Sequence, residues 1–310
     1  GLILNSCGTS IGDNTSVVRE KDPNLKNALF QNSSGDIKVA ISLNEDGVLY
    51  YDVLFQDREI LKASRLGLVR EDSDFSQNLE ITEISGRKNI QDNYTLLHGK
   101  QKEISYNANK HILHLKNGDG ELMDIIFQLS DDGAAFRYYF PQSSTEVKKI
   151  VEERTSYNFP KDARGWLQPM SKAKTGWEHT NPSYEENYLE NVSLTTIPAP
   201  GEGWVYPALF KSNEVWVLIT EAGLDRTYCG TRLVNSVSGE GMEIEFPQQE
   251  EIFPGGGLEP ESTLPWHTPW RIITIGNLKT IAESTLGTDL ATPTAVNDTQ
   301  FIKTGLASWS

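Results

Sequence analysis

Short stretches of alternating apolar and polar residues, separated by turns that contain Asn-Gly or Asp-Gly, recur along this 310-residue chain and constrain its fold more than any other feature. The clearest example is the run 111–140, in which the turns 117–120 and 130–133 separate three apolar stretches. Glycine in such turns supplies the positive φ that tight hairpins require. The pattern predicts three consecutive antiparallel strands.

The same pattern predicts further strands on either side of this run. They comprise a hairpin at 37–41 and 48–55 and single strands at 204–210, 215–220, 242–246 and 270–275. Helical periodicity is confined to one segment, which begins at Asn277, a good N-cap residue, and ends near Leu290. Many short strands joined by Gly and Pro turns are typical of antiparallel architectures. We predict a mainly all-β fold, a large antiparallel β-sandwich with one short C-terminal helix.

The acidic composition excludes one class of partner. The chain has 28 Lys and Arg against 43 Asp and Glu, which gives a formal net charge of −15. Affinity for nucleic acid comes largely from basic side chains that neutralise phosphates. We therefore exclude DNA, RNA and anionic membrane surfaces as partners. A neutral ligand or a cation fits this charge better, although acidity also serves solubility alone.

The first residues, Leu4-Asn5-Ser6-Cys7, resemble the end of a bacterial lipoprotein signal, in which an apolar region leads to a lipidated cysteine. The alternative is a chance Ser-Cys pair. On the first interpretation the protein is a periplasmic or outer-membrane-anchored lipoprotein of a Gram-negative bacterium, and it contacts the membrane only through the lipid on Cys7. The one other cysteine is Cys229, so no disulfide framework is expected. We interpret residues 1–35 as a signal remnant and tether.

Candidate chemistry gathers between residues 165 and 206, where Trp, Tyr and Glu are frequent and strand periodicity is weak. Long irregular segments on a β-sandwich commonly carry function. Tyr184-Glu185-Glu186 offers adjacent carboxylates, which suit a hard cation such as calcium or acid–base catalysis. A solvated acidic turn is the alternative. One carboxylate cannot complete a calcium shell of about 6 to 8 oxygens, so other ligands would have to come from elsewhere.

Other motifs are interpreted as structural. The five histidines show no zinc-type spacing, and His111 and His114 lie three residues apart in an expected strand, so they face opposite sides of the sheet. The glycine-rich stretch 254–257 lacks the Lys-Ser/Thr of a phosphate loop.

Seven short segments together carry a resemblance to a known family. They are SRLGL (64–68), SKAKTGW (171–177), YE (184–185), YPALF (206–210), EAGLD (221–225), TPWR (268–271) and TDLA (288–291). Together they resemble the N-terminal domain of glycoside hydrolase family 97, bacterial enzymes that cleave α-glucosides or α-galactosides. The resemblance covers residues 36–310. It implies a sandwich of the galactose-mutarotase type at 36–292 and the start of a truncated (β/α)₈ catalytic barrel at 293–310.

On this resemblance the whole protein is an exo-acting, calcium-dependent α-glycosidase whose catalytic carboxylates lie in its own C-terminal barrel. No residue of this chain is then catalytic, and the chain alone is expected to be inactive. The resemblance implies that the sandwich packs on the barrel and lends one glutamate to a calcium ion at the substrate pocket. By motif position this ligand is Glu185, with Glu186 as the register alternative. Trp177 and Tyr184 are the expected contacts with an α-linked oligosaccharide. The choice between glucoside and galactoside, and between inverting and retaining chemistry, stays open.

Two alternative functions use the same part of the chain. One is a free-standing carbohydrate-binding module anchored by Cys7, in which Trp177 or Trp204 stacks on a sugar ring. The other is an aldose mutarotase or epimerase, for which His179 and Glu185 are the nearest candidates. Because a fold does not imply a function, glycan titration and mutarotation assays are needed to separate these alternatives from the first.

Overall fold

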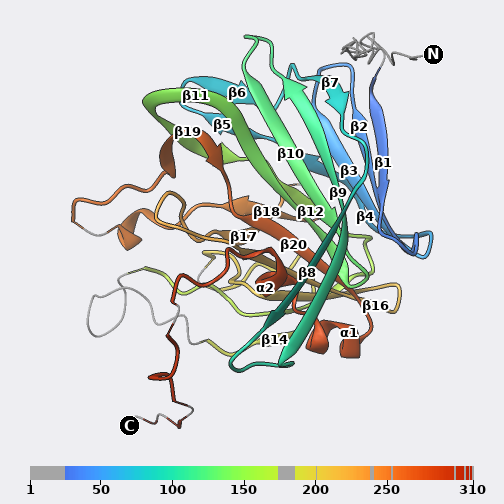
Figure 1. Cartoon of the computed structure of the whole chain (residues 1–310), viewed down its shortest axis with the longest axis vertical. Coiled ribbons are helices and arrows are strands. Elements are labelled where there is room, and N and C mark those ends of the chain that lie inside the picture. Colours follow the sequence, from blue (N-terminus) through green and yellow to red (C-terminus); the bar gives the residue numbers. More distant parts are fainter. Residues whose placement is uncertain are drawn as a thin grey trace, which may run out of the picture.

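The computed structural model describes residues 25–173, 186–199, 201–237, 241–252, 254–296, 298–303, 305–306 and 308. These residues form the predicted all-β sandwich, which is built from three antiparallel sheets (Figure 1). One sheet has four strands in the order β1 (Asn27–Gln31), β2 (Ile37–Leu43), β3 (Leu49–Phe55) and β4 (Arg58–Leu66). The predicted hairpin is β2–β3 and is confirmed.

The largest sheet has thirteen strands and forms the frame of the domain. Its main path, in spatial order, is β14 (Leu189–Ser193), β13 (Arg164–Leu167), β15 (Ala208–Ser212), β16 (Val215–Ala222), β20 (Trp270–Gly276), β11 (Gly133–Glu153), β10 (Leu122–Leu129), β9 (Glu103–Lys116) and β7 (Glu80–Ile84). At its sides, β8 (Lys88–Thr95) pairs with β9, β19 (Glu261–His267) and β5 (Leu68–Arg70) pair with β11, and β6 (Ser73–Phe75) pairs with β5. The three consecutive strands predicted in the run 111–140 are β9, β10 and β11, and they are confirmed.

A third, three-stranded sheet follows the order β12 (Ser156–Asn158), β18 (Gly241–Glu245) and β17 (Arg232–Asn235). Trp204 lies beside it and forms isolated bridges with Leu233 and Pro169. The strand predicted at 204–210 therefore begins only at Ala208. Pro207, which comes directly before, has no N–H to donate to a ladder.

Side chains from the facing sheets fill the interior of the sandwich. The ring centroids of Tyr51 in β3 and Phe136 in β11 are 5.6 Å apart, and Tyr138 lies next to Phe136. The Tyr51 hydroxyl donates to the backbone oxygen of Ser156 at 2.8 Å and so joins the first sheet to the third. The first, third and fifth residues of β2 and of β3 are buried, as expected for strands with one face on a core.

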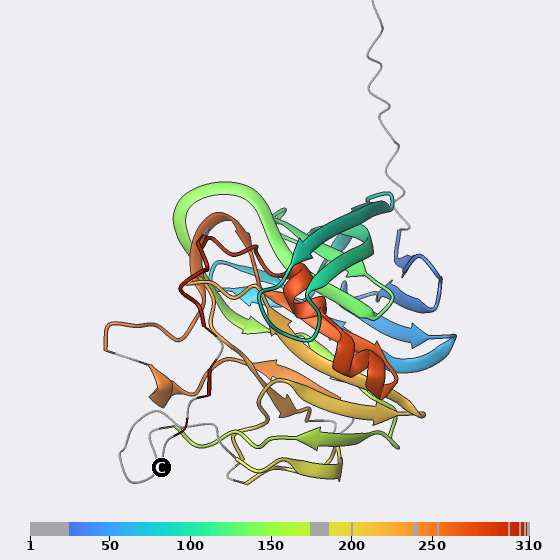
Figure 2. The same ribbon diagram turned by 60° about the horizontal axis from the view of Figure 1, so that its bottom comes forward.

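The outer face of the large sheet is partly covered by two short helices, α1 (Leu278–Glu283) and α2 (Leu286–Leu290). Both contact β16 and β20 (Figure 2). Trp270 of β20 packs in a second buried cluster with the leucines of α2. Because both faces of β20 are covered, all of its residues are buried, including the polar Arg271 and Thr274.

The single helix predicted from Asn277 to Leu290 is divided in two. Asn277 is the N-cap as predicted, since its side chain accepts the N–H of Thr280 at 2.9 Å. The first helix ends before Ser284, whose hydroxyl donates to Asp132 at 2.5 Å. This contact joins residues far apart in the sequence, and local periodicity could not reveal it.

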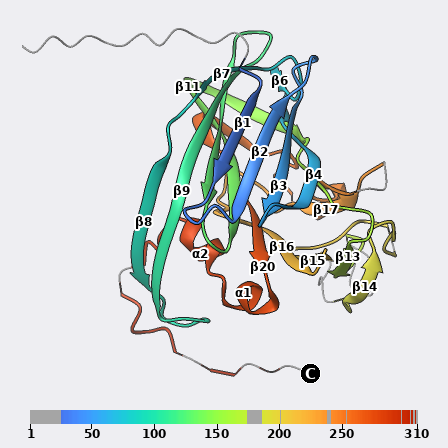
Figure 3. The ribbon, with the colours of Figure 1, turned by 90° about the vertical axis from the view of Figure 1, so that its right-hand side faces the viewer.

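The long β8–β9 hairpin lies along one side of the sandwich and reaches the helices (Figure 3). The Tyr94 hydroxyl donates to Asp289 at 2.6 Å, and Lys100 donates to the backbone oxygen of Ser284 at 3.1 Å. The hairpin therefore holds both helices against the sheet.

The interpretation of residues 1–35 as remnant and tether is wrong for β1. This strand pairs with β2, and Phe30 is buried in the core. Only three adjacent apolar residues mark it in a polar stretch, which is too short a signal for periodicity. Among the residues that the structure describes, no helix has the length and apolar character needed to span a bilayer.

Candidate functional site

The residues predicted to bind sugar, metal or lipid fall in parts of the chain outside the described residues. They are Trp177, Tyr184, Glu185 and Cys7, together with His179 of the mutarotase alternative. Their roles stay predictions. The structure does place Ala173 and Glu186, which flank the segment 174–185.

Gln248 forms hydrogen bonds with the two residues Ser171 and Ala173, which come before that segment. Its Oε1 accepts the N–H of Ala173 at 2.7 Å, and its Nε2 donates to the backbone oxygen of Ser171 at 2.8 Å. The short 3₁₀ helix η1 (Gln249–Glu251) fixes Gln248 in turn, because the carboxylate of Glu251 accepts the backbone N–H of Gln248 at 2.6 Å. Gln248 is buried, so losing either side-chain bond would leave a buried backbone group without a partner.

Glu186, the register alternative to Glu185, lies at the other end of the segment. Its exposed carboxylate accepts a hydrogen bond from the Ser171 hydroxyl at 3.1 Å. Ser171 therefore contacts both Gln248 and Glu186, so it links described residues on either side of the segment 174–185.

Within the described parts of the chain, no group of three or more His, Cys, Asp or Glu side chains is arranged to hold a metal ion. Since calcium takes about 6 to 8 oxygen ligands, Glu186 and Ser171 would supply only part of a shell.

A buried ionic network lies elsewhere in the interior. Arg271 of β20 donates from Nε and Nη2 to the two carboxylate oxygens of Glu153 at 2.8 and 2.6 Å, and from Nη1 to Glu221. Thr231 donates to Glu221 from its N–H at 3.0 Å and from its hydroxyl at 2.9 Å, and the Tyr228 hydroxyl donates to Glu153 at 2.8 Å. The network joins β11, β16 and β20 with the loop after β16.

The two carboxylates of this network keep Arg271 protonated. Burial opposes the charged guanidinium, but Glu153 and Glu221 outweigh it and raise the pKa of Arg271 well above its usual value. Burial raises the pKa of the neighbouring Cys229 thiol to about 12. A thiol that stays protonated is a poor nucleophile.

Two further expectations concern single residues. Trp204, one of the two tryptophans named for the carbohydrate-binding alternative, cannot stack on a sugar, because it is fully buried and its indole N–H donates to Asn235 at 3.2 Å. His111 and His114 do face opposite sides of β9: His111 stacks on Phe30, and His114 bonds Asp124 at 2.7 Å. The structural interpretation of both histidines agrees with these contacts.

Reasoning from sequence missed Gln248 and the buried network. Glu221 and Arg271 lie in two of the segments that carried the resemblance, EAGLD and TPWR, and a charged residue inside an apolar strand was the available signal for Arg271. Glu153 is separated from Arg271 by 118 positions, so no local pattern links the pair.

Comparison with known proteins gives the same family as the sequence segments. A family model described as "Glycosyl-hydrolase 97 N-terminal" matches residues 31–293. The chain is 29% identical over 266 residues to a probable retaining alpha-galactosidase of Streptomyces bingchenggensis, covering 85% of this chain and 38% of the relative. It is 22% identical over 292 residues to a retaining alpha-galactosidase of Bacteroides thetaiotaomicron, covering 89% of this chain and 42% of the relative. The chain thus spans about two fifths of the length of these curated relatives.

Solved structures agree. A beta-arabinopyranosidase superposes with a TM-score of 0.80 and 34% identity, over 84% of this chain and 42% of its own. A glycoside hydrolase family 97 enzyme from Pseudoalteromonas sp. strain K8, solved with panose and also with acarbose, superposes with a TM-score of 0.73 at 22–23% identity, over 87% of this chain and 39% of its own. The latter shows the shared fold. Because the family model covers most of the sequence, the predicted resemblance is confirmed, and the chain belongs to the N-terminal domain family of glycoside hydrolase family 97.

Proposed function

We propose that this chain is the non-catalytic N-terminal sandwich of an exo-acting α-glycosidase. The observation that carries the proposal is coverage: similarity extends over 85–89% of this chain but over only 38–42% of the two relatives named as glycosidases. The relatives therefore contain a large additional part. In this proposal that part corresponds to a catalytic barrel with the reacting carboxylates, and the 310-residue chain alone is inactive.

An α-linked galactoside is the substrate that we propose. Two relatives are named alpha-galactosidases, and the beta-arabinopyranosidase shares 34% identity. Arabinopyranose can carry its ring hydroxyls in the configuration of galactopyranose and lacks only the exocyclic hydroxymethyl group. The relatives at 29% and 34% identity therefore carry this proposal of a galacto-configured substrate.

Retention of anomeric configuration belongs to the same proposal, because both curated relatives are named as retaining. In a retaining glycosidase one carboxylate attacks the anomeric carbon while a second, about 5 to 5.5 Å away, protonates the leaving oxygen. We place both groups in the barrel, outside this chain.

Calcium at the substrate pocket, with Glu185 as the ligand from this chain, is also proposed. Support comes from the anchors at both ends of segment 174–185, since Gln248 and Ser171 hold the chain where it enters and leaves. Trp177 and Tyr184 of the same segment would contact the sugar. A bound calcium ion would act as a Lewis acid toward substrate oxygen.

An apolar groove supports packing of the sandwich on the barrel. It has a volume of about 860 Å³ and lies between the two helices, the tip of the β8–β9 hairpin and residues 294–302. Leu97, Val296 and Ile302 at its lining are 61%, 47% and 46% exposed. Exposed apolar surface of this kind is typical of an interaction site. We propose that the barrel covers this groove.

Anchoring through a lipid on Cys7 and a periplasmic or outer-membrane location are proposed from the motif Leu4-Asn5-Ser6-Cys7. Metabolic labelling with palmitate in a Gram-negative host, using a precursor that carries this motif, tests the proposal. We expect labelling that Cys7→Ser abolishes and Cys229→Ser leaves unchanged. Labelling that survives Cys7→Ser would contradict it.

Hydrolysis by the whole protein tests the proposed function. We expect the whole protein to release 4-nitrophenol from 4-nitrophenyl α-galactoside. This activity should be lost in EDTA and should return when calcium is added. Glu185→Gln should weaken the response to calcium, and Glu186→Gln is the matched control for the register. Activity on the α-glucoside alone would overturn the substrate, activity unaffected by EDTA would overturn the metal, and hydrolysis by the 310-residue chain would overturn the non-catalytic role.

A further inference from the structure

A polar cleft, separate from the apolar groove, lies where the end of β11 meets the third sheet. The proposed function does not use it. Its volume is about 380 Å³, and its walls come from β11, β17, β18 and the pair Leu258–Glu259. This volume falls within the range of small-ligand sites. Glu153 also lines the cleft, but its side chain is fully buried and bonds to Arg271.

Charged side chains of both signs line the cleft. Three are guanidinium groups and five are carboxylates. An anionic ligand would meet the carboxylates, and a cationic ligand would meet the guanidinium groups. A neutral ligand whose groups both donate and accept hydrogen bonds suits this mixed lining, because hydrogen bonds to charged partners are stronger than neutral ones.

Hydrogen-bonding capacity remains at the lining. The exposed guanidinium group of Arg154 lines the cleft as a hydrogen-bond donor, with its Nη2 paired to Glu152 at 2.6 Å. The carboxylates of Glu243 and Glu259 are exposed and form no ion pair with any described residue. Donors and acceptors are therefore present together around one cleft.

The wall also has an apolar component. Phe246 and Leu258 are partly buried and line the cleft beside the charged groups. A pyranose ring has the matching character, since its hydroxyls lie around a face of C–H groups that packs on apolar and aromatic side chains.

We propose that this cleft binds a neutral saccharide without catalysing its reaction. Glu243 and Glu259 accept hydrogen bonds from ring hydroxyls, Arg154 donates to ring oxygens, and Phe246 contacts the C–H face. The inference concerns binding alone and does not depend on hydrolysis by the whole protein.

Titration of the 310-residue chain tests this proposal. Raffinose, an α-galactoside, and panose, an α-glucoside, are added separately while binding is followed by calorimetry and by amide chemical shifts. We expect saturable binding of at least one sugar, with shifts concentrated in β17, β18 and residues 151–156. The double variant Glu243→Gln, Glu259→Gln should bind at least about tenfold more weakly. Glu250→Gln, an exposed glutamate outside the lining, is the matched control.

Both variants alter only exposed carboxylates, so they should fold as the parent does, which the amide spectrum checks. Absence of binding of either sugar would overturn the proposal. So would binding that the double variant retains in full, since the sugar would then occupy a different site. Neither result bears on the hydrolysis assay of the whole protein, so the two proposals fail separately.

Discussion

Arg271 and Glu153 form a two-bond ion pair in which neither side chain is exposed to solvent. Replacing Arg271 by methionine would keep much of the side-chain volume but leave Glu153 and Glu221 buried beside each other without their cation. Breaking a buried ion pair in this way costs about 3 to 5 kcal/mol. We expect a loss of that size in the free energy of unfolding, measured by urea denaturation.

The control for this variant is Arg226→Met, since Arg226 is exposed in the loop after β16. Its effect should stay within about 0.5 kcal/mol. If the two substitutions proved equally mild, the buried network would not be a support of the fold.

The fold could be predicted from the sequence where the signal is local. Turns with Asn-Gly and Asp-Gly marked β9, β10 and β11, and the N-cap residue Asn277 marked the start of α1. The signal failed where distant residues decide the structure. The bond from Ser284 to Asp132 divides the predicted helix, and pairing with β2 turns an expected tether into β1.

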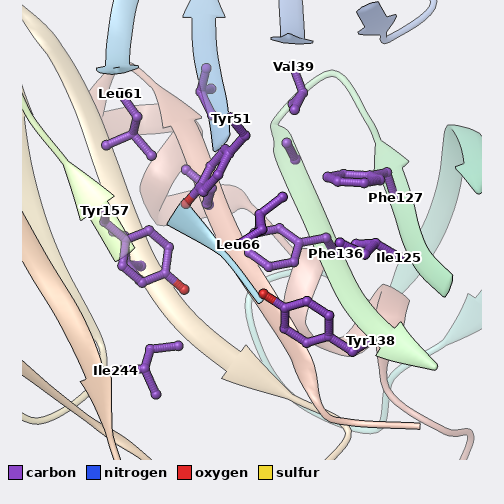
Figure 4. Close-up of a cluster of buried hydrophobic side chains, with 14 of the residues drawn as sticks. Val39, Tyr51, Leu61, Leu66, Ile125, Phe127, Phe136, Tyr138, Tyr157 and Ile244 are labelled. Carbon is purple, nitrogen blue, oxygen red and sulfur yellow. The ribbon is translucent and has the colours of Figure 1, made fainter. Parts of the chain in front are cut away.

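The candidate site was less predictable for the same reason. An aromatic residue in an irregular segment predicts a sugar contact, yet Trp204 bridges Leu233 and Pro169 and is buried in the core. Three tyrosines from separate strands, Tyr51, Tyr138 and Tyr157, are also buried in the core (Figure 4). The sequence shows which residues have aromatic, hydroxyl or charged side chains. Whether such a side chain is buried, and which residue it bonds to, depends on the whole fold.

Acid should destabilise the domain through His267. Burial lowers the pKa of His267 to about 4, with Arg137 and Lys110 acting in the same direction, whereas an unfolded chain protonates histidine near pH 6.5. Between these values the unfolded state binds more protons, so stability falls as the pH falls from about 6.5 to 4. Burial also lowers the pKa of His111, which adds to the same trend.

Unfolding midpoints at pH 7.5 and pH 5 check this expectation. His267→Gln should reduce the difference between the two, while His98→Gln, in the turn between β8 and β9, should leave it unchanged. Because His267 is an exposed residue at the end of β19, solvent screening keeps the effect much smaller than for a fully buried imidazole. An unchanged difference in the His267 variant would contradict the assignment.

Gly203 should not tolerate a side chain. Its φ is +96°, and a Cβ there would collide with the backbone oxygen of Leu233, which accepts the N–H of Trp204 at 2.7 Å. Gly203→Ala is therefore expected to lower stability by more than about 1 kcal/mol. Gly257→Ala is the control, because a Cβ at that position meets open space. Thermal unfolding of the two variants checks the prediction, and equal melting temperatures would refute it.

The anchor at Gln248 should control the start of segment 174–185 more than it controls the whole fold. Gln248→Ala removes the partners of the Ala173 N–H and the Ser171 carbonyl, which costs about 1 to 3 kcal/mol. Amide hydrogen exchange should therefore accelerate at Ala173 in this variant, while the amides of β10 keep their protection. Gln249→Ala, at the exposed neighbouring position, is the matched control. If exchange at Ala173 were the same in both variants, the anchor would lie elsewhere. If β10 also lost protection, Gln248 would support the whole sandwich, because local and global opening are separate events in native-state exchange.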